Sequence, residues 1–95
     1  MIGSFADKNA ELIWKGEAAK KLPRDIQADA REVLRILNEI KSYNDFQRLP
    51  HLRAHKLIGD RNNRWSLRIS SGWRVTFFWN EETATASLVR IEDYH

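Results

Sequence analysis

The sequence contains no cysteine among its 95 residues. This absence excludes a disulfide-bonded scaffold, a metal site with thiolate ligands and a cysteine nucleophile, and it favours a reducing, cytoplasmic location. No apolar run approaches the roughly 18–20 residues that a membrane-spanning helix requires. Residues 1–7 also lack the basic segment followed by an apolar segment that marks a signal peptide, so we expect none.

The chain is too short for a second hydrophobic core, so we expect a single domain over residues 1–95. Hydrophobic residues make up 42% of the sequence. A disordered chain normally lacks this apolar content, because it cannot offset the entropy that folding costs. The composition therefore indicates a globular domain.

The net charge of +3 is distributed unevenly along the chain. Residues 1–46 contain eight basic and eight acidic side chains, whereas the only acid in residues 48–74 is Asp60. Seven residues of that second segment are basic: Arg48, Arg53, Lys56, Arg61, Arg64, Arg68 and Arg74. Arginine suits bidentate recognition of phosphate. The segment therefore favours an anionic partner, with nucleic acid as the first choice.

The first half of the sequence has the pattern of a short strand followed by two helices. Residues 2–5 are apolar enough for a strand, and Asp7 can cap a helix that stops at Gly16. Pro23 opens a second helix, which we expect to run from Arg24 to about Ser42. One stripe of this helix is apolar, with Ile26, Ala30, Val33, Leu34, Leu37 and Ile40 at helical spacing.

The second half changes to an alternation with period two. After a connection over residues 43–50, it predicts strands at residues 53–58, 64–69, 73–79 and 83–91. Helices followed by a run of strands indicate an α+β fold with an antiparallel meander. We expect all four tryptophans to lie in the core: Trp14, Trp65, Trp73 and Trp79.

The hairpin loop over residues 70–72 brings two arginines together. If Gly72 takes the left-handed conformation, Ile69 faces Trp73 and Arg68 faces Arg74. Like charges directly opposite each other in a ladder are unfavourable, so an anion between the arginines would explain them. The alternative is that the two side chains are exposed and fan apart into water.

Histidines supply candidate groups for proton transfer. His51 and His55 have metal-binding spacing for a helix, but Pro50 and the following strand separate them, so we expect no metal and no cofactor. An imidazole titrates near neutral pH and can donate or accept a proton. The chain closes with Asp93, Tyr94 and His95, which is either a frayed end or a set suited to binding and cleaving RNA.

Four motifs together carry a resemblance to a known family. They are LRAHKLIGDR at 52–61, WSLRIS at 65–70, GWRVTF at 72–77 and EDYH at 92–95. Together they resemble the HigB toxins of the RelE superfamily. The resemblance implies a RelE-like toxin of type II toxin–antitoxin systems that enters the ribosomal A site and cleaves mRNA without a metal. It also implies three partners, namely a HigA-like antitoxin with a helix-turn-helix, the 70S ribosome and mRNA, and no membrane.

The resemblance also assigns expected roles to particular residues. It implies an active site of His55, Arg68, Arg74, Asp93, Tyr94 and His95. The two arginines would hold the scissile phosphate, either histidine would act as base or acid, Tyr94 would stack on a base and Asp93 would orient a neighbour. The other basic residues are expected to bind RNA: Arg48, Arg53, Lys56, Arg61 and Arg64.

One position departs from the family pattern. Relatives often carry lysine immediately before Gly-Asp-Arg, where this chain has Ile58. Lys56 lies two residues earlier, hence on the same face of a strand, and would substitute in part.

Two other functions are compatible with the sequence. A non-catalytic gyrase poison of the ParE branch would need neither His55 nor the closing Asp-Tyr-His. An RNA- or ribosome-binding module would depend on Arg53, Arg61 and Arg64 and not on the histidines. An enzyme would instead lose most of its turnover when His95 or Arg74 is replaced, while its affinity for the ribosome would largely remain.

Overall fold

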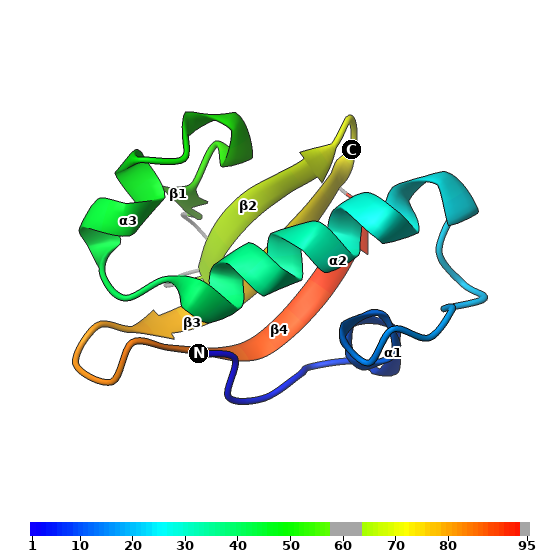
Figure 1. Ribbon diagram of the computed structural model, residues 1–95, viewed down its shortest axis with the longest axis horizontal. Helices are drawn as coiled ribbons and strands as arrows, with labels where there is room; N and C mark the ends of the chain where they lie inside the picture. The colour runs from blue at the N-terminus through cyan, green and yellow to red at the C-terminus, as the bar shows by residue number, and fades with distance from the viewer. Residues whose placement is uncertain (58–63, 94–95) are drawn as a thin grey trace.

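Helices cover one face of a four-stranded antiparallel sheet (Figure 1). The computed structural model describes residues 1–57 and 64–93. Its elements are α1 (Lys8–Trp14), α2 (Arg24–Glu39), α3 (Tyr43–Gln47), the 3-10 helix η1 (Pro50–Leu52), β1 (His55–Lys56), β2 (Arg64–Ser70), β3 (Trp73–Asn80) and β4 (Thr85–Asp93). The strands lie in the order β1-β2-β3-β4, so the predicted α+β class and antiparallel meander are confirmed.

The first predicted helix forms with the expected caps. The Asp7 side chain accepts a hydrogen bond from the backbone N–H of Ala10 at 2.9 Å, which satisfies one of the free donors at the start of α1. Gly16 follows the helix with a φ of +84°, the left-handed conformation that ends many helices. Ala10 and Ile13 are buried, so the cap positions one edge of the core.

Replacing Asp7 with alanine is expected to destabilise the protein by about 1 kcal/mol, because the Ala10 N–H loses its partner. The free energy of unfolding should be measured by urea denaturation at equilibrium. The matched control is Glu17→Ala, which removes an exposed carboxylate just beyond the helix. Equal stability of the two variants would contradict this role of the cap.

Helix α2 lies across the sheet and supplies most of the helical side of the core (Figure 1). Its predicted apolar stripe is buried against Leu67, Val75 and Phe77. The helix ends at Glu39, three residues earlier than predicted, because Ile40 is already extended with a ψ of 133°. Ile40 is nevertheless buried and still belongs to the core.

The predicted strand over residues 2–5 does not form as a regular strand. Its strand pairing with β4 consists of two isolated parallel bridges, Ile2 with Ala86 and Phe5 with Val89. Leu88 lies between the bridged positions of β4 and has a φ of +51°. This irregularity interrupts the ladder, and Ser4 Oγ instead accepts the Leu88 N–H at 2.9 Å.

The predicted connection over residues 43–50 is also more structured than expected. It contains α3 and leads directly into η1. Arg53 then has a φ of +48°, which is incompatible with a strand, so β1 (His55–Lys56) begins two residues later than predicted, and the predicted end at residue 58 lies outside the described residues. Ala84 likewise has a φ of +51°, and β4 begins at Thr85 instead of residue 83.

The hairpin between β2 and β3 confirms the pairing of the two arginines. Arg68 and Arg74 are Cα partners, and Gly72 has a φ of +80°. The prediction for the next pair is wrong, because the register shifts at Ile69 and places Ser70 opposite Trp73. This shift adds one residue to β2 beside the turn, which is the definition of a β-bulge.

The tryptophans lie at the border of the core rather than inside it. All four are partly buried and pack against the buried cluster: Trp14, Trp65, Trp73 and Trp79. Among the fully buried side chains, the largest is Phe77. The large indole rings therefore cover the edges of the core, while smaller residues fill its centre.

Candidate active site on the open face of the sheet

The face of the sheet opposite the helices carries a row of arginines. Alternation along the strands directs Leu67, Val75 and Phe77 towards α2, so their neighbours point to the other side. We call this other side the arginine face. It contains Arg64, Ser66, Arg68, Arg74, Thr76, Phe78, Arg90 and Glu92. Four cations against one carboxylate make it basic within the part of the chain that the structure describes.

Two buried hydroxyls organise the arginine face. Arg74 Nη1 donates to Ser66 Oγ at 3.2 Å, and Arg64 Nη2 donates to Thr76 Oγ1 at 2.8 Å. The Thr76 hydroxyl in turn donates to a carboxylate oxygen of Glu92. Ser66 and Thr76 are at most 2% exposed, because the long side chains lie over them. Buried hydroxyls with partners hold these long side chains in defined positions.

Arg64 is more firmly held than a surface cation. Besides its bond to Thr76, it donates to the backbone carbonyl of Leu88 at 3.0 Å, and its guanidinium lies 4.8 Å from the centre of the Phe78 ring. The bulge in β4 makes that carbonyl available, since Leu88 lies at the register shift. Arg64 therefore joins β2 to β4 in addition to contributing positive charge.

Arg68 and Arg74 supply the pair of opposed guanidinium groups that the sequence predicted. Both are half-buried, and their Cα atoms are partners in the ladder. Within residues 1–57 and 64–93, Arg68 makes no ion pair. An anion bound between two such groups would offset their repulsion and could accept several N–H bonds at once.

His55 lies at the edge of this face and is exposed. It is the Cα partner of Ser66, the residue that binds Arg74. Its Nδ1 lies 3.0 Å from the backbone carbonyl of Arg53. A carbonyl can only accept, so Nδ1 carries the proton in this contact and Nε2 of the neutral ring can accept another. His51 is held apart from His55, since it belongs to η1.

The carboxylate beside Arg74 is Glu92, which the sequence did not single out. The register pairs Arg74 with Glu92 and pairs Asp93 with Trp73. Arg90, also missed, is exposed and is the Cα partner of Thr76. The signal that could have found them is the alternation of Val89 and Ile91 with Arg90 and Glu92, because it directs the two polar side chains away from the core.

The other predicted residues are spread more widely. Arg48 ends α3 in a 3.8 Å ion pair with Asp45, and Arg53 is exposed after η1. Lys56 is exposed and is the Cα partner of Trp65. Arg61, Ile58, Tyr94 and His95 lie outside the described residues. Across residues 1–57 and 64–93, no three histidine or acidic side chains could hold a metal ion, and no helix could cross a membrane.

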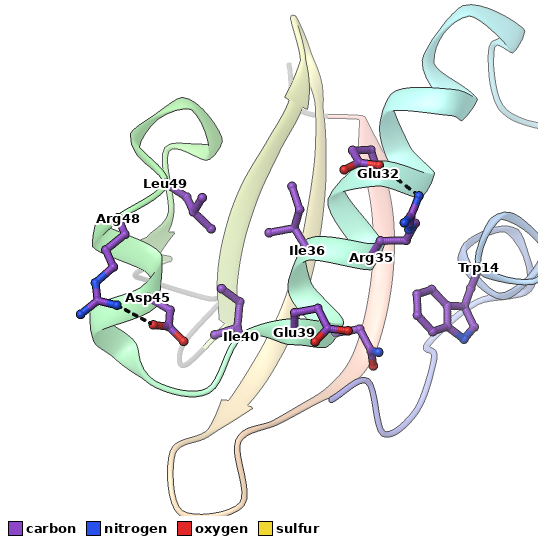
Figure 2. A pocket seen from close by; sticks show the side chains of 10 residues that line it. Trp14, Glu32, Arg35, Ile36, Glu39, Ile40, Asp45, Arg48 and Leu49 are labelled. Carbon is purple, nitrogen blue, oxygen red and sulfur yellow. Dashed lines mark ion pairs between the residues drawn. The ribbon is translucent and has the colours of Figure 1, made fainter.

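A hollow of about 560 Å³ lies on the helical side of the molecule (Figure 2). Figure 2 shows Trp14 on one side of α2 and Leu49 on the other. Charged residues on its rim pair with each other, including Arg35 with Glu32 at 3.5 Å. Its described lining contains carboxylates but no histidine, and none of the predicted catalytic residues.

Comparisons with known proteins identify the family of this chain. Residues 3–95 match the family described as the RelE-like toxin of type II toxin-antitoxin system HigB. The chain is 30% identical over 101 residues to the endoribonuclease HigB of Proteus vulgaris, with 100% of both chains covered. A toxin of a type II system has a cognate antitoxin. The resemblance seen in the sequence is thus confirmed, and this chain belongs to the family of HigB-like toxins.

Proposed function

We propose that this chain is an endoribonuclease that cleaves mRNA in the ribosomal A site. The observation that supports it most is the opposed pair Arg68 and Arg74, with His55 at the same face. Its relative from Proteus vulgaris is named an endoribonuclease. A basic, open sheet face is suited to the phosphodiester backbone of RNA.

The proposed reaction uses the nucleophile that RNA itself carries. The 2′-oxygen attacks the adjacent phosphorus while a base removes its proton. A bond from the 2′-oxygen to phosphorus forms, and the bond to the 5′-oxygen breaks. An acid protonates that leaving oxygen, so the products are a 2′,3′-cyclic phosphate and a free 5′-hydroxyl. This sequence of proton transfers requires one base, one acid and stabilisation of the charged intermediate.

We assign these roles to residues of the arginine face and of the chain's end. Arg68 and Arg74 hold the scissile phosphate and stabilise its developing charge. His55 is the base, because its Nδ1 contact leaves Nε2 to accept the 2′-proton. His95 is the acid. Tyr94 stacks on a base of the RNA, and Asp93 orients a neighbouring group.

The proposed partners follow from the same assignment. They are the 70S ribosome, mRNA and a HigA-like antitoxin that carries a helix-turn-helix, all in the cytoplasm. Exposed basic residues of the α3–β1 side, including Arg48, Arg53 and Lys56, contact ribosomal or messenger RNA in this proposal, as does Arg61. Their contribution is electrostatic, so ribosome binding should weaken as salt increases.

The test is cleavage of a defined mRNA on stalled ribosomes by the purified protein, with the new 3′ ends mapped. Cuts within the A-site codon are expected, and His55→Ala and His95→Ala should each reduce the rate by about 10²–10⁴-fold. Lys20→Ala, an exposed change outside the site, is the matched control.

The other outcomes lead to the two competing functions. Ribosome binding without cleavage would refute the enzyme and favour a binding module, for which Arg53→Glu should abolish binding. If the protein neither cuts mRNA nor binds ribosomes, inhibition of DNA gyrase supercoiling should be measured. Inhibition would identify a non-catalytic poison.

A further inference from the structure

A second hollow, of about 420 Å³, opens beside the edge strand β1. It lies between α3 and β1, and the residues that line it differ from those of the hollow in Figure 2. Its lining combines aromatic rings, an amide, a lysine and a histidine: Tyr43, Phe46, Gln47, Ala54, His55, Lys56 and Trp65. Aromatic rings beside polar donors are the usual surroundings of a nucleobase bound by a protein.

The aromatic wall of this edge hollow is built on Trp65. The Trp65 ring stacks on Phe46, with centroids 5.2 Å apart, and on Tyr43, with centroids 5.6 Å apart. Phe46 is buried, but Tyr43 is 42% exposed, an unusual position for a large ring. The backbone N–H of Tyr43 donates to the Glu81 carboxylate, which anchors the start of α3. The exposed ring is therefore presented by a supported element.

Polar groups at the hollow can contact the edge of a base. Gln47 and Lys56 are both exposed there. The glutamine amide has both a donor and an acceptor, and the lysine adds donors and a positive charge. This combination can form hydrogen bonds with a base edge while the aromatic wall binds its flat face.

His55 joins the edge hollow to the arginine face. It lines the hollow, and it is the Cα partner of Ser66, which accepts the hydrogen bond from Arg74. Neighbouring strands lie about 4.8 Å apart, so β1 is only two strand spacings from the strand of Arg74. Trp65 and its partner Lys56 lie on the helical face, so the RNA passes over the edge strand β1 between the hollow and the two arginines.

We propose that the edge hollow is a nucleobase subsite, which binds one base of the RNA adjacent to the phosphate held by Arg68 and Arg74. Tyr43 stacks on that base, and Gln47 and Lys56 contact its edge. This inference rests on the proposed function. The subsite gives the toxin a means to prefer some codons over others.

The test combines cleavage kinetics with photocrosslinking. With the ribosome-bound mRNA as substrate, Tyr43→Ala should lower kcat/KM roughly tenfold, mainly through a higher KM, because base stacking is lost. Tyr43→Phe retains the ring and should regain the affinity. Gln47→Ala should change the relative rates at different A-site codons. Lys15→Ala, which replaces the exposed lysine at the end of α1, is the control for lost charge.

The crosslink locates the base directly. An mRNA with 4-thiouridine beside the cut site should attach to the peptide that contains Tyr43 or the one that contains Lys56, as mapped by mass spectrometry. If cleavage proceeds but the crosslink maps elsewhere and folded Tyr43→Ala, Gln47→Ala and Lys56→Ala all retain wild-type kinetics, the subsite is wrong and the proposed function stands. If the wild-type protein neither cuts nor crosslinks to mRNA, the proposed function fails and the subsite fails with it.

Discussion

Replacing Arg74 with alanine is expected to reduce mRNA cleavage by about 10²–10³-fold, the usual cost of removing one preorganised donor that stabilises a charged intermediate. Arg74 is the better of the two opposed arginines for this test, because its Nη1 is already positioned by Ser66 Oγ at 3.2 Å. The rate should be measured at saturating ribosome–mRNA complex. Ribosome affinity should remain nearly unchanged, since the other cations of the arginine face are retained.

Two further variants make the Arg74 result specific. Arg74→Lys keeps the charge but loses the planar fork, so it should recover only part of the rate. Arg35→Ala removes an exposed arginine from the helical side and should cleave like the wild type. Equal activity of Arg74→Ala and Arg35→Ala, with both proteins folded, would rule out phosphate binding by Arg74.

Replacing Phe77 with alanine is expected to destabilise the protein by about 3–5 kcal/mol, because its side chain is fully buried in the core. A domain of this size has a total stability of only about 5–15 kcal/mol. Part of the population should therefore be unfolded at 37 °C. Equilibrium denaturation followed by circular dichroism measures this change directly.

The adjacent residue of β3 supplies the matched control. Phe78 lies on the arginine face, where it is half-buried beneath the Arg64 guanidinium. Phe78→Ala leaves no closed cavity in the core, so it should cost about 1–2 kcal/mol through lost contact area and the cation–π interaction. Equal losses in the two variants would contradict the assignment of opposite faces.

The pairing of Arg68 with Arg74 could be predicted because it depends on short-range features. A seven-residue stretch of alternating pattern leads to a tight turn, and Gly72 supplies the positive φ that the turn requires. The pair beside the turn differs from the prediction, but the bulge at Ile69 restores the expected register at Arg68 and Arg74. The boundaries of α1 were predictable for a similar reason, since Asp7 and Gly16 act on the helix next to them.

Counting the β3–β4 register from its turn would give the wrong carboxylate for the arginine face. In an unbroken β3–β4 ladder, Asp93 would lie on the side of Arg74 and Glu92 on the side of the helices. The bulge at Leu88 inserts one residue and exchanges the two positions. The adjacent apolar residues Leu88 and Val89 break the alternation at the bulge, but the groups that bond Leu88 there, Ser4 and Arg64, come from distant segments.

The sequence by itself determined the two helices α1 and α2, the four-stranded meander that follows them and the two opposed arginines. These features depend on caps, periodicity and turn residues that act within a few positions of each other. Only the tertiary structure decided that Glu92 is the Cα partner of Arg74, that Arg64 is held by Thr76, and that a hollow forms between α3 and β1. These features depend on register and packing between segments far apart in the chain, where a shift of one residue turns a side chain from one face to the other.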